Sequence, residues 1–365
     1  MTKQQLTLLR NSERSTYRRC RLKHHWTYTQ KLAPPRTKGA LSFGTLVHEA
    51  MAEFYPPGVK RGPHPARTFE RLYKAQQHDF DQWTEDGERY DALELGVSML
   101  EGYVKEYGSD DHIEILQPEM SMQIDVCDRQ GNYLVTWVGT CDAAYRNRST
   151  GRVGLLEHKT AKTVEEELRV NSGYGEQGLS YWWAANIFFH NNGMLGEEEN
   201  LEHVLFNWLR KGIPDPRPIN AAGHRLNKPS KQALMDRCEQ LGMKPTGKVE
   251  DLMDRIRGAG EDPLLLGEPS KTQPKPLYHR FALEFGPGEL ESINKRIRAE
   301  AWEISQVRKG KLPLIKNPTK DCSWDCPFKE PCEIHEMGGD FESVLELEFG
   351  TWDPYSDHEL LEEKA

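Results

Sequence analysis

Two carboxylates and one amine, Asp142, Glu157 and Lys159, are the residues of this chain whose types and spacing are best suited to chemistry. Two carboxylates suit a hard divalent cation that keeps some of its waters. A lysine beside them helps to lower the pKa of an attacking water and stabilises the charge that develops on a phosphate. If the three side chains meet, the set predicts metal-assisted hydrolysis of a phosphodiester.

The stretch GTCDAAYRNRSTGRVGLLEHK places these residues on a predicted β-hairpin. Leu134–Tyr145 is strand-like, Asn147–Arg152 supplies turn residues, and Val153–Lys159 returns as a second strand. Because side chains alternate along a strand, the Glu and the Lys of the E-x-K sequence project from one face, which the Asp of the partner strand can reach. The same spacing also occurs as ordinary surface charge, so the hairpin alone does not decide.

The bulk composition limits the classes of protein. With 365 residues and 37% hydrophobic content, the chain has room for one large domain or two smaller ones. No apolar run is long enough to cross a bilayer, and no apolar segment follows the basic N-terminus, so we expect neither a membrane span nor a secretory signal. A cytoplasmic location follows, and with it reduced thiols.

The net charge of −9 is unevenly distributed. Residues 336–365 hold ten acidic residues and one lysine, which accounts for the whole net charge and predicts a solvated, partly disordered tail. Residues 1–48 hold ten Lys and Arg against Glu13. A basic N-terminal segment in a chain that is otherwise neutral outside its acidic tail is compatible with the phosphate backbone of DNA as a ligand.

Four of the seven cysteines are spaced like metal ligands: Cys20, Cys322, Cys326 and Cys332. The last three lie in the loop sequence DCSWDCPFKEPC, and the first could join them if the two ends of the chain meet. A disulfide framework is disfavoured in the cytoplasm, so we expect a metal. Four thiolates suit structural zinc or an iron–sulfur cluster, and the spacing leaves both open. The other three are expected to be small buried residues: Cys127, Cys141 and Cys238.

A long insert separates two predicted strands, Leu201–Leu209 and Leu277–Phe285, by about 65 residues, too many for a hairpin loop. Within it, Pro229–Gly258 predicts two helices, the first capped by Ser230 and the second beginning at Lys248. The pair looks like a SAP-type helix-extended-helix module, a class that binds DNA; the alternative is a helical pair used only for packing. The lysines that could neutralise phosphates are Lys228, Lys231, Lys244 and Lys248.

One motif in the insert resembles a nucleotide-binding P-loop but lacks a residue that the P-loop requires. Gly242–Lys248 matches the first seven positions of a P-loop, but Val249 stands where Ser or Thr must reach Mg²⁺, and an amphipathic helix precedes it. We therefore expect no ATPase activity. A helicase or recombination partner would be another protein.

Five features follow one another in a specific order: a lone N-terminal cysteine, a GTLVHEA helix, a G-x-x-D…E-x-K hairpin, a Q-x-x-x-Y helix and a C-terminal cysteine triplet. In this order the chain resembles the RecB-like branch of the PD-(D/E)xK nucleases, over roughly residues 8–335. Within that branch it is most similar to the iron–sulfur exonucleases related to the AddB nuclease domain and to the CRISPR-associated and phage-encoded RecB-like proteins. The resemblance implies an α/β core, a central mixed sheet flanked by helices.

The resemblance also implies roles for residues that match the family motifs. His48, Asp142 and Glu157 would ligate Mg²⁺ or Mn²⁺, with the backbone carbonyl of His158 as a further ligand. Lys159 would be the catalytic lysine, acting with the metal on the attacking water. Without the resemblance, a helix histidine such as His48 would be read as an ordinary polar-face residue.

Further residues match motifs outside the hairpin. Gln177 and Tyr181, one helical turn apart, would position DNA or the catalytic lysine. Glu119 would be an accessory acidic residue, and Tyr17 matches the family tyrosine that precedes the first cysteine. The cysteine quartet would hold a [4Fe–4S] cluster rather than zinc, although its CxxxC departs from the CxxC of many relatives.

These expectations combine into one domain plan and one function. Residues 1–222 and 261–335 would form the nuclease core, 223–260 a SAP-like insert, and 336–365 the acidic tail. The function would be a metal-dependent DNA exonuclease acting on ends or single strands, in phage or bacterial recombination or repair. The alternatives are a non-catalytic, metal-stabilised DNA-binding protein and a nuclease of CRISPR spacer acquisition; the intact D…ExK set argues against the first.

Overall fold

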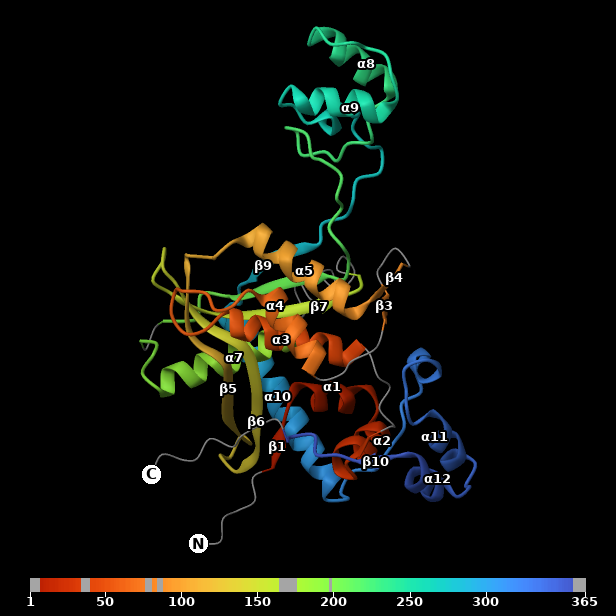
Figure 1. Cartoon of the computed structure of the whole chain (residues 1–365). Helices are drawn as coiled ribbons and strands as arrows, with labels where there is room; N and C mark the ends of the chain where they lie inside the picture. The colour runs from red at the N-terminus through yellow and green to blue at the C-terminus, as the bar shows by residue number, and fades with distance from the viewer. Residues whose placement is uncertain are drawn as a thin grey trace. The chain divides into compact units, whose positions relative to one another are not determined.

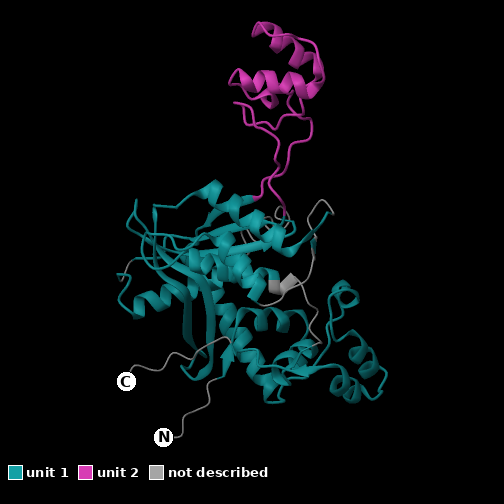
Figure 2. Ribbon diagram, in the orientation of Figure 1, with its two compact units in different colours: residues 1–211, 278–365 teal, residues 212–277 magenta. Residues whose placement is uncertain are grey.

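The computed structural model (Figure 1) describes residues 7–33, 40–75, 81–83, 88–163, 176–196 and 199–356. The chain divides into two compact units (Figure 2). The first comprises residues 1–211 and 278–365, and the second comprises residues 212–277. Within the described ranges, no helix has both the length and the apolar character that a membrane span requires.

A six-stranded mixed sheet forms the centre of the first unit. Its strands are β1 (Leu8–Leu9), β5 (Ile113–Cys127), β6 (Tyr133–Asn147), β7 (Val153–Ala161), β8 (Val204–Arg210) and β9 (Tyr278–Leu283). β6 pairs antiparallel with β5 along its length, while β1 and β7 share its opposite edge. β7 runs parallel to β8, and β8 antiparallel to β9. The predicted α/β class with a central mixed sheet is confirmed.

Helices cover both faces of this sheet (Figure 1). The helices on one face are α7 (Glu176–Asn191) and α10 (Pro287–Arg308), and those on the other are α3 (Ala40–Phe54), α4 (Pro65–Ala75) and α5 (Ala92–Tyr107). Because neighbouring strand residues face opposite sides, Glu157 meets α7 whereas His158 meets α5. A short hairpin, β3 (Asp81–Trp83) and β4 (Arg89–Asp91), precedes α5.

The hairpin expected from the sequence is present, and the two strands predicted to flank the insert also pair antiparallel. Leu134–Tyr145 lies within β6 and Val153–Lys159 within β7, and the turn closes with the amide of Asn147 donating to the carbonyl of Arg152 at 2.9 Å. Gly151 supplies the left-handed backbone of this turn, with φ +76°. The second hairpin is β8–β9, interrupted by the long insert.

Segments from both ends of the chain form a lobe of the first unit, which we call the cysteine lobe. The N-terminal elements are α1 (Asn11–Arg19), α2 (Arg21–His24), the π-helix η1 (His25–Thr29) and β2 (Leu32–Ala33). The C-terminal elements are η3 (Lys320–Ser323), α11 (Lys329–Glu336), α12 (Phe341–Glu348) and β10 (Gly350–Thr351). Leu22 and Trp26 pack with Phe328 and Leu345 in a small core of their own.

Residues 336–356 of the predicted solvated, partly disordered tail are structured and include α12 and β10. β10 pairs antiparallel with β2, and the indole of Trp352 donates to the carbonyl of Thr27 at 3.3 Å. The Tyr355 hydroxyl donates to the buried carboxylate of Glu13. Leu345 is buried, and Phe341 and Phe349 pack against the same small core, so this apolar contact opposes the repulsion among the carboxylates. Residues 357–365 lie outside the described residues.

The second unit contains α8 (Lys231–Gln240), α9 (Val249–Gly258) and the 3₁₀ turn η2 (Pro263–Leu266). The two predicted helices are confirmed: Ser230 Oγ caps α8 by accepting from the amide of Ala233 at 3.1 Å, and Gly242 follows α8 with φ +68°. A fully buried cluster joins the helices: Leu234, Cys238, Leu252 and Ile256. The unit is wider than residues 223–260 because the bridges Ile219–Arg225 and Leu226–Pro269 extend its packing.

Candidate functional site

Asp142 lies where β6 and β7 separate. β7 pairs with β6 over Ala143–Arg146, and the carboxylate of Asp142 reaches across just beyond that pairing. Its Oδ2 accepts from the backbone amide of His158 at 2.5 Å, and its Oδ1 lies 2.9 Å from Nδ1 of His48 on α3. The splayed hairpin and α3 therefore meet at this one carboxylate.

Glu157 is the centre of a second group of contacts. Its Oε1 accepts from Nζ of Lys159 at 2.5 Å and from Nε2 of Gln177 at 3.1 Å. Gln177 Nε2 also donates to the hydroxyl of Tyr181 at 3.0 Å, so the Q-x-x-x-Y pair of α7 acts on the glutamate itself. The structure thus brings Glu157, Lys159, Gln177 and Tyr181 together.

The two carboxylates have opposite protonation tendencies. Burial opposes ionisation of Asp142, but His48 and, more weakly, Lys159 hold the pKa of that carboxyl below its usual range. Burial raises the pKa of Glu157 to about 7, with a further contribution from Asp142 that Lys159 opposes. Burial of His48 lowers the pKa of its imidazole, but the neighbouring Asp142 carboxylate outweighs this effect. The pKa of His48 is therefore raised above its ordinary value. A divergence of this kind between neighbouring carboxyls is typical of sites that handle protons or cations.

One oxygen of this group has no hydrogen-bonding partner among the described residues. Glu157 is 3% exposed, and its Oε2 is buried without a donor. A buried carboxylate oxygen left in this way is costly, and a bound divalent cation would satisfy it. The donor set of one imidazole and two carboxylates fits Mg²⁺ or Mn²⁺.

Glu119 belongs to the same electrostatic neighbourhood. On β5 it stands between the pairs Pro118–Ala143 and Met120–Cys141, which places it opposite Asp142. Its φ of +44° lies in the left-handed region that a non-glycine residue seldom adopts. Burial of its carboxyl and the charge of Asp142 raise the pKa of Glu119 to about 7.

The ring of His158 points away from the carboxylates. It is buried on the opposite face of the sheet, stacked on Tyr55 with centroids 5.5 Å apart, and burial lowers its pKa to about 4. Asn207 Nδ2 lies 3.3 Å from its Nδ1. The contribution of His158 to the site is therefore its backbone, whose amide already holds Asp142.

Sequence reasoning missed a buried polar network on that opposite face. Arg280 of β9 donates to both oxygens of Asp110 at 2.6 and 2.8 Å, and its Nε donates to Asn207 Oδ1 at 2.5 Å. The hydroxyls of Tyr55 and Tyr103 complete it, 2.7 Å apart, with Tyr55 donating to Asp110 at 2.7 Å. The network fixes α3, α5, β8 and β9 around His158. Its one sequence signal is an arginine within an apolar strand, LYHRF.

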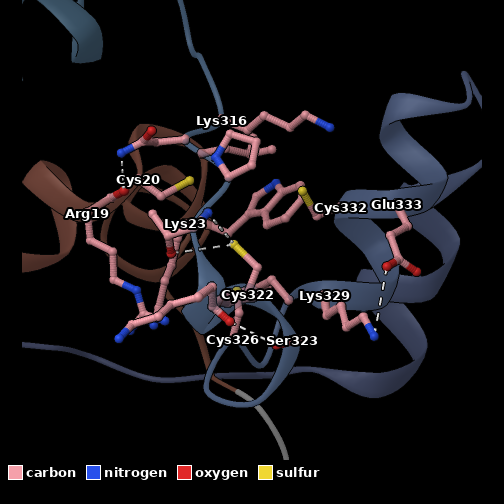
Figure 3. A pocket seen from close by; sticks show the side chains of 17 residues that line it. Arg19, Cys20, Lys23, Lys316, Cys322, Ser323, Cys326, Lys329, Cys332 and Glu333 are labelled. Atoms are coloured by element: carbon pink, nitrogen blue, oxygen red, sulfur yellow. Dashed lines mark hydrogen bonds and ion pairs between the residues drawn. The ribbon is translucent and has the colours of Figure 1, made fainter.

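The four predicted cysteines line one cavity of about 320 Å³, shown in Figure 3. Cys20 comes from the end of α1, whereas Cys322, Cys326 and Cys332 come from η3, the following loop and α11. The ends of the chain therefore meet, as the sequence required for a four-thiol site. Lysines and an arginine also line it: Arg19, Lys23, Lys316, Lys320 and Lys329.

The thiols act on one another electrostatically. Burial raises the pKa of Cys326, and the neighbouring Cys322 and Cys20 raise it further, while Lys23 opposes them. Cys332 behaves in the same way. Thiols that oppose each other's ionisation are stabilised as thiolates by a shared cation, so the donor set fits a thiolate-bound metal centre.

The described residues hold no group of three or more His, Cys, Asp or Glu side chains gathered closely enough to enclose a single metal ion, and this applies to His48, Asp142 and Glu157 as well as to the four thiols. The cavity is thus lined by thiols, but they do not converge on one point. Of the other cysteines, Cys141 and Cys238 are buried as expected, and Cys127 is only half-buried.

The four lysines named for the insert lie on the second unit around α8 and α9. They have no ion-pair partner among its described residues, whereas the arginines Arg217, Arg237 and Arg257 are paired with acidic neighbours. Arg255 instead donates to the carbonyls of Lys244 and Thr246, which holds the extended link between the helices. All four lysines are exposed: Lys228, Lys231, Lys244 and Lys248.

Comparison with known proteins adds one match. The family model described as the PD-(D/E)XK nuclease superfamily matches residues 11–333, from the first turn of α1 to α11. The matched region includes the hairpin, α3, α7 and all four cysteines of the cavity. No curated protein matches the sequence.

Proposed function

The chain belongs to the PD-(D/E)XK nuclease superfamily, and from that membership we propose that it is a Mg²⁺- or Mn²⁺-dependent DNA exonuclease. The observation that carries the proposal is the buried Oε2 of Glu157, which has no donor among the described residues although Lys159 contacts the other oxygen of the same carboxylate. A surface cluster of ordinary charges would leave that oxygen in water rather than buried without a donor.

In this proposal His48, Asp142 and Glu157 hold the cation, with the backbone carbonyl of His158 as a further ligand. The bound cation supplies Lewis acidity and an ionised water at neutral pH. Lys159 stabilises the charge that develops on the scissile phosphate. Gln177 and Tyr181 hold Glu157 in place, and Glu119 opposite Asp142 is the accessory acidic residue.

For the cysteine cavity we propose an iron–sulfur cluster, with zinc as the alternative. A single zinc ion draws four sulfurs to about 2.3 Å from one point. The cavity of about 320 Å³ that the four thiols line has room for a group larger than one ion, and the resemblance to iron–sulfur exonucleases supports the cluster. The cluster would tie the N-terminal α1 to the C-terminal α11.

Two finer proposals rest on less. The insert, with its four unpaired lysines on a helix pair of SAP type, would bind duplex DNA. A role in phage or bacterial recombination or repair, and a helicase or recombination partner on another chain, are implied by the resemblance to RecB-like exonucleases.

The proposal is tested with the purified protein on end-labelled linear DNA and on a covalently closed circle, in Mg²⁺, Mn²⁺ or EDTA. We expect stepwise loss of label from the linear substrate with either cation, no loss in EDTA, and an intact circle. Because a closed circle has no ends, its cleavage would show that the protein is an endonuclease and not an exonuclease. DNA binding without any cleavage would favour the non-catalytic alternative.

A further inference from the structure

Arg14 of α1 is completely buried, and every contact of its guanidinium is with a polar group. It donates to Glu300 of α10 at 2.6 Å, to Glu176 at 2.7 Å, and to Ser180 Oγ and Asn11 Oδ1 at 3.0 Å each. A buried guanidinium is tolerated only when its donors are satisfied in this way. Such a cluster fixes the elements that supply the acceptors.

Two of these acceptors are the immediate chain neighbours of proposed site residues. Glu176 precedes Gln177, and Ser180 precedes Tyr181. Both lie in the first turns of α7, so Arg14 sets the rotation and height of the helix at the position where Gln177 reaches Glu157 at 3.1 Å. The chemistry of the site does not require Arg14 to touch the substrate.

The other end of α1 is held by the C-terminal part of the cysteine lobe. Arg19, its last residue, pairs with Asp325 at 2.5 Å, and the side chain of Asn317 donates to the carbonyl of Arg19 at 3.0 Å. Cys20 follows directly and lines the thiol cavity. α1 therefore has the thiol cavity at one end and, less than two turns away, the guanidinium that holds α7.

We propose that α1 links the thiol cavity to the nuclease site, with Arg14 as the positioning residue. A group bound by Cys20 and the three C-terminal cysteines fixes the position of α1. Arg14 on α1 then fixes the first turns of α7, which carry Gln177 and Tyr181, and Gln177 holds Glu157. The inference rests on the proposed nuclease site and thiol-bound group, and it adds that the second supports the first.

The first test replaces Arg14 by Met and uses Arg18→Met as the matched control. Arg18 contacts the same glutamates, at 3.1 Å from Glu176 and 3.0 Å from Glu300, but its side chain is 36% exposed, so solvent screens these pairs. We expect R14M to keep its iron or zinc content per chain. Its α7 amides should exchange faster with deuterium, and its single-turnover cleavage should slow at least tenfold.

R18M should stay within twofold of wild type in all three measurements. Arg14→Lys, which keeps the charge but not the planar fork, should fall between R14M and wild type. If R14M does not fold, Ser180→Ala removes one acceptor of Arg14, together with the hydrogen bond from Ser180 Oγ to the carbonyl of Glu176 at 2.6 Å, and should show the same pattern more weakly. Wild-type cleavage and α7 exchange in folded R14M would overturn the proposal.

The second test works from the other end. Cys20→Ser should lose the thiol-bound group and show faster exchange in α7, whereas Cys127→Ser, outside the cavity, should change neither. Unchanged α7 exchange after the group is lost would overturn the link, as would wild-type protein that holds no metal at these thiols. If the wild-type protein fails to cleave DNA but Cys20→Ser still speeds amide exchange in α7, the nuclease assignment is refuted and the link between α1 and α7 still holds.

Discussion

Glu157 shows how a single side chain can define a site. One of its oxygens is shared by Lys159 and Gln177, and the other has no donor among the described residues. The lysine and the amide fix the position of the carboxylate without satisfying it. In the proposed metal site, the remaining oxygen would be preorganised for the cation, which costs less than reorganising a mobile side chain on binding.

Lys159→Met and Asp142→Asn should each slow DNA cleavage by at least about a hundredfold, because they remove a charge that acts on the metal, the water or the phosphate. Folding and DNA binding should be largely retained. Single-turnover cleavage and circular dichroism measure the two effects, with the exposed Lys105→Met as the control. Digestion at the wild-type rate by either site variant would refute the assignment of the site.

Asp110 allows a prediction about stability and pH. Although burial opposes it, the Arg280 guanidinium holds the pKa of the Asp110 carboxyl below its ordinary value. A carboxyl with a depressed folded-state pKa contributes stability above its unfolded-state pKa of about 4, and that contribution is lost as the pH falls through the folded-state value. Asp110→Asn should thus cost about 3 kcal/mol at pH 7 and less at pH 3.

Urea unfolding of the variant and of wild type at the two pH values measures this difference. Asp111→Asn, at an exposed neighbour whose side chain accepts from the hydroxyl of Ser109, is the control and should change little at either pH. A cost for Asp110→Asn that stays constant between pH 7 and pH 3 would show that ionisation of Asp110 is not what stabilises the network.

At the scale of elements, short-range patterns were sufficient for prediction and long-range contacts were not. The alternation of Leu134–Tyr145 and the capping Ser230 report on neighbours in the chain, so β6 and α8 could be predicted. Arg14 and Arg280 could not, because their acceptors lie 162 and 170 residues away, at Glu176 and Asp110. The arginine within LYHRF marks an unusual strand position, but the sequence pattern does not identify a partner that comes from another element.

The cysteine lobe can be tested as an element. Cys20→Ser should lose the brown colour and the iron and sulfide that we expect in anaerobically purified protein, and its thermal midpoint should fall, because the link between α1 and α11 is broken. Cys127→Ser should keep both. Metal analysis that finds stoichiometric zinc and no sulfide would replace the cluster by a structural zinc site.

At the scale of the whole molecule, the second unit enters and leaves through a hairpin whose strands pair at Leu209 and Tyr278. Replacing residues 212–277 by Asn-Gly should therefore close that hairpin with a short turn and leave the sheet intact. Cleavage of a short oligonucleotide should stay near the wild-type rate. Binding to long duplex DNA should weaken, with a log–log salt slope shallower by roughly 0.9 for each phosphate that the protein no longer neutralises.

Two to four phosphates are expected as a rough figure from the four unpaired lysines. The matched variant keeps the unit folded and changes only Lys228, Lys231, Lys244 and Lys248 to Ala, and its salt slope should become shallower by the same amount. An unchanged slope in both variants would mean that the helix pair serves packing or binds another protein.

The meeting of the two ends of the chain also sets an order of events during synthesis. Cys20 and Arg14 emerge from the ribosome early, but Asp325, Cys322 and Glu300 follow about 300 residues later. At roughly 5–20 residues per second, α1 waits between about 15 and 60 seconds for its partners. A nascent or truncated chain can therefore form the hairpin and the contacts of Arg14 with Glu176 and Ser180 on α7, yet it lacks the C-terminal partners that hold α1 itself. The nuclease site would reach its final geometry only when synthesis is nearly complete.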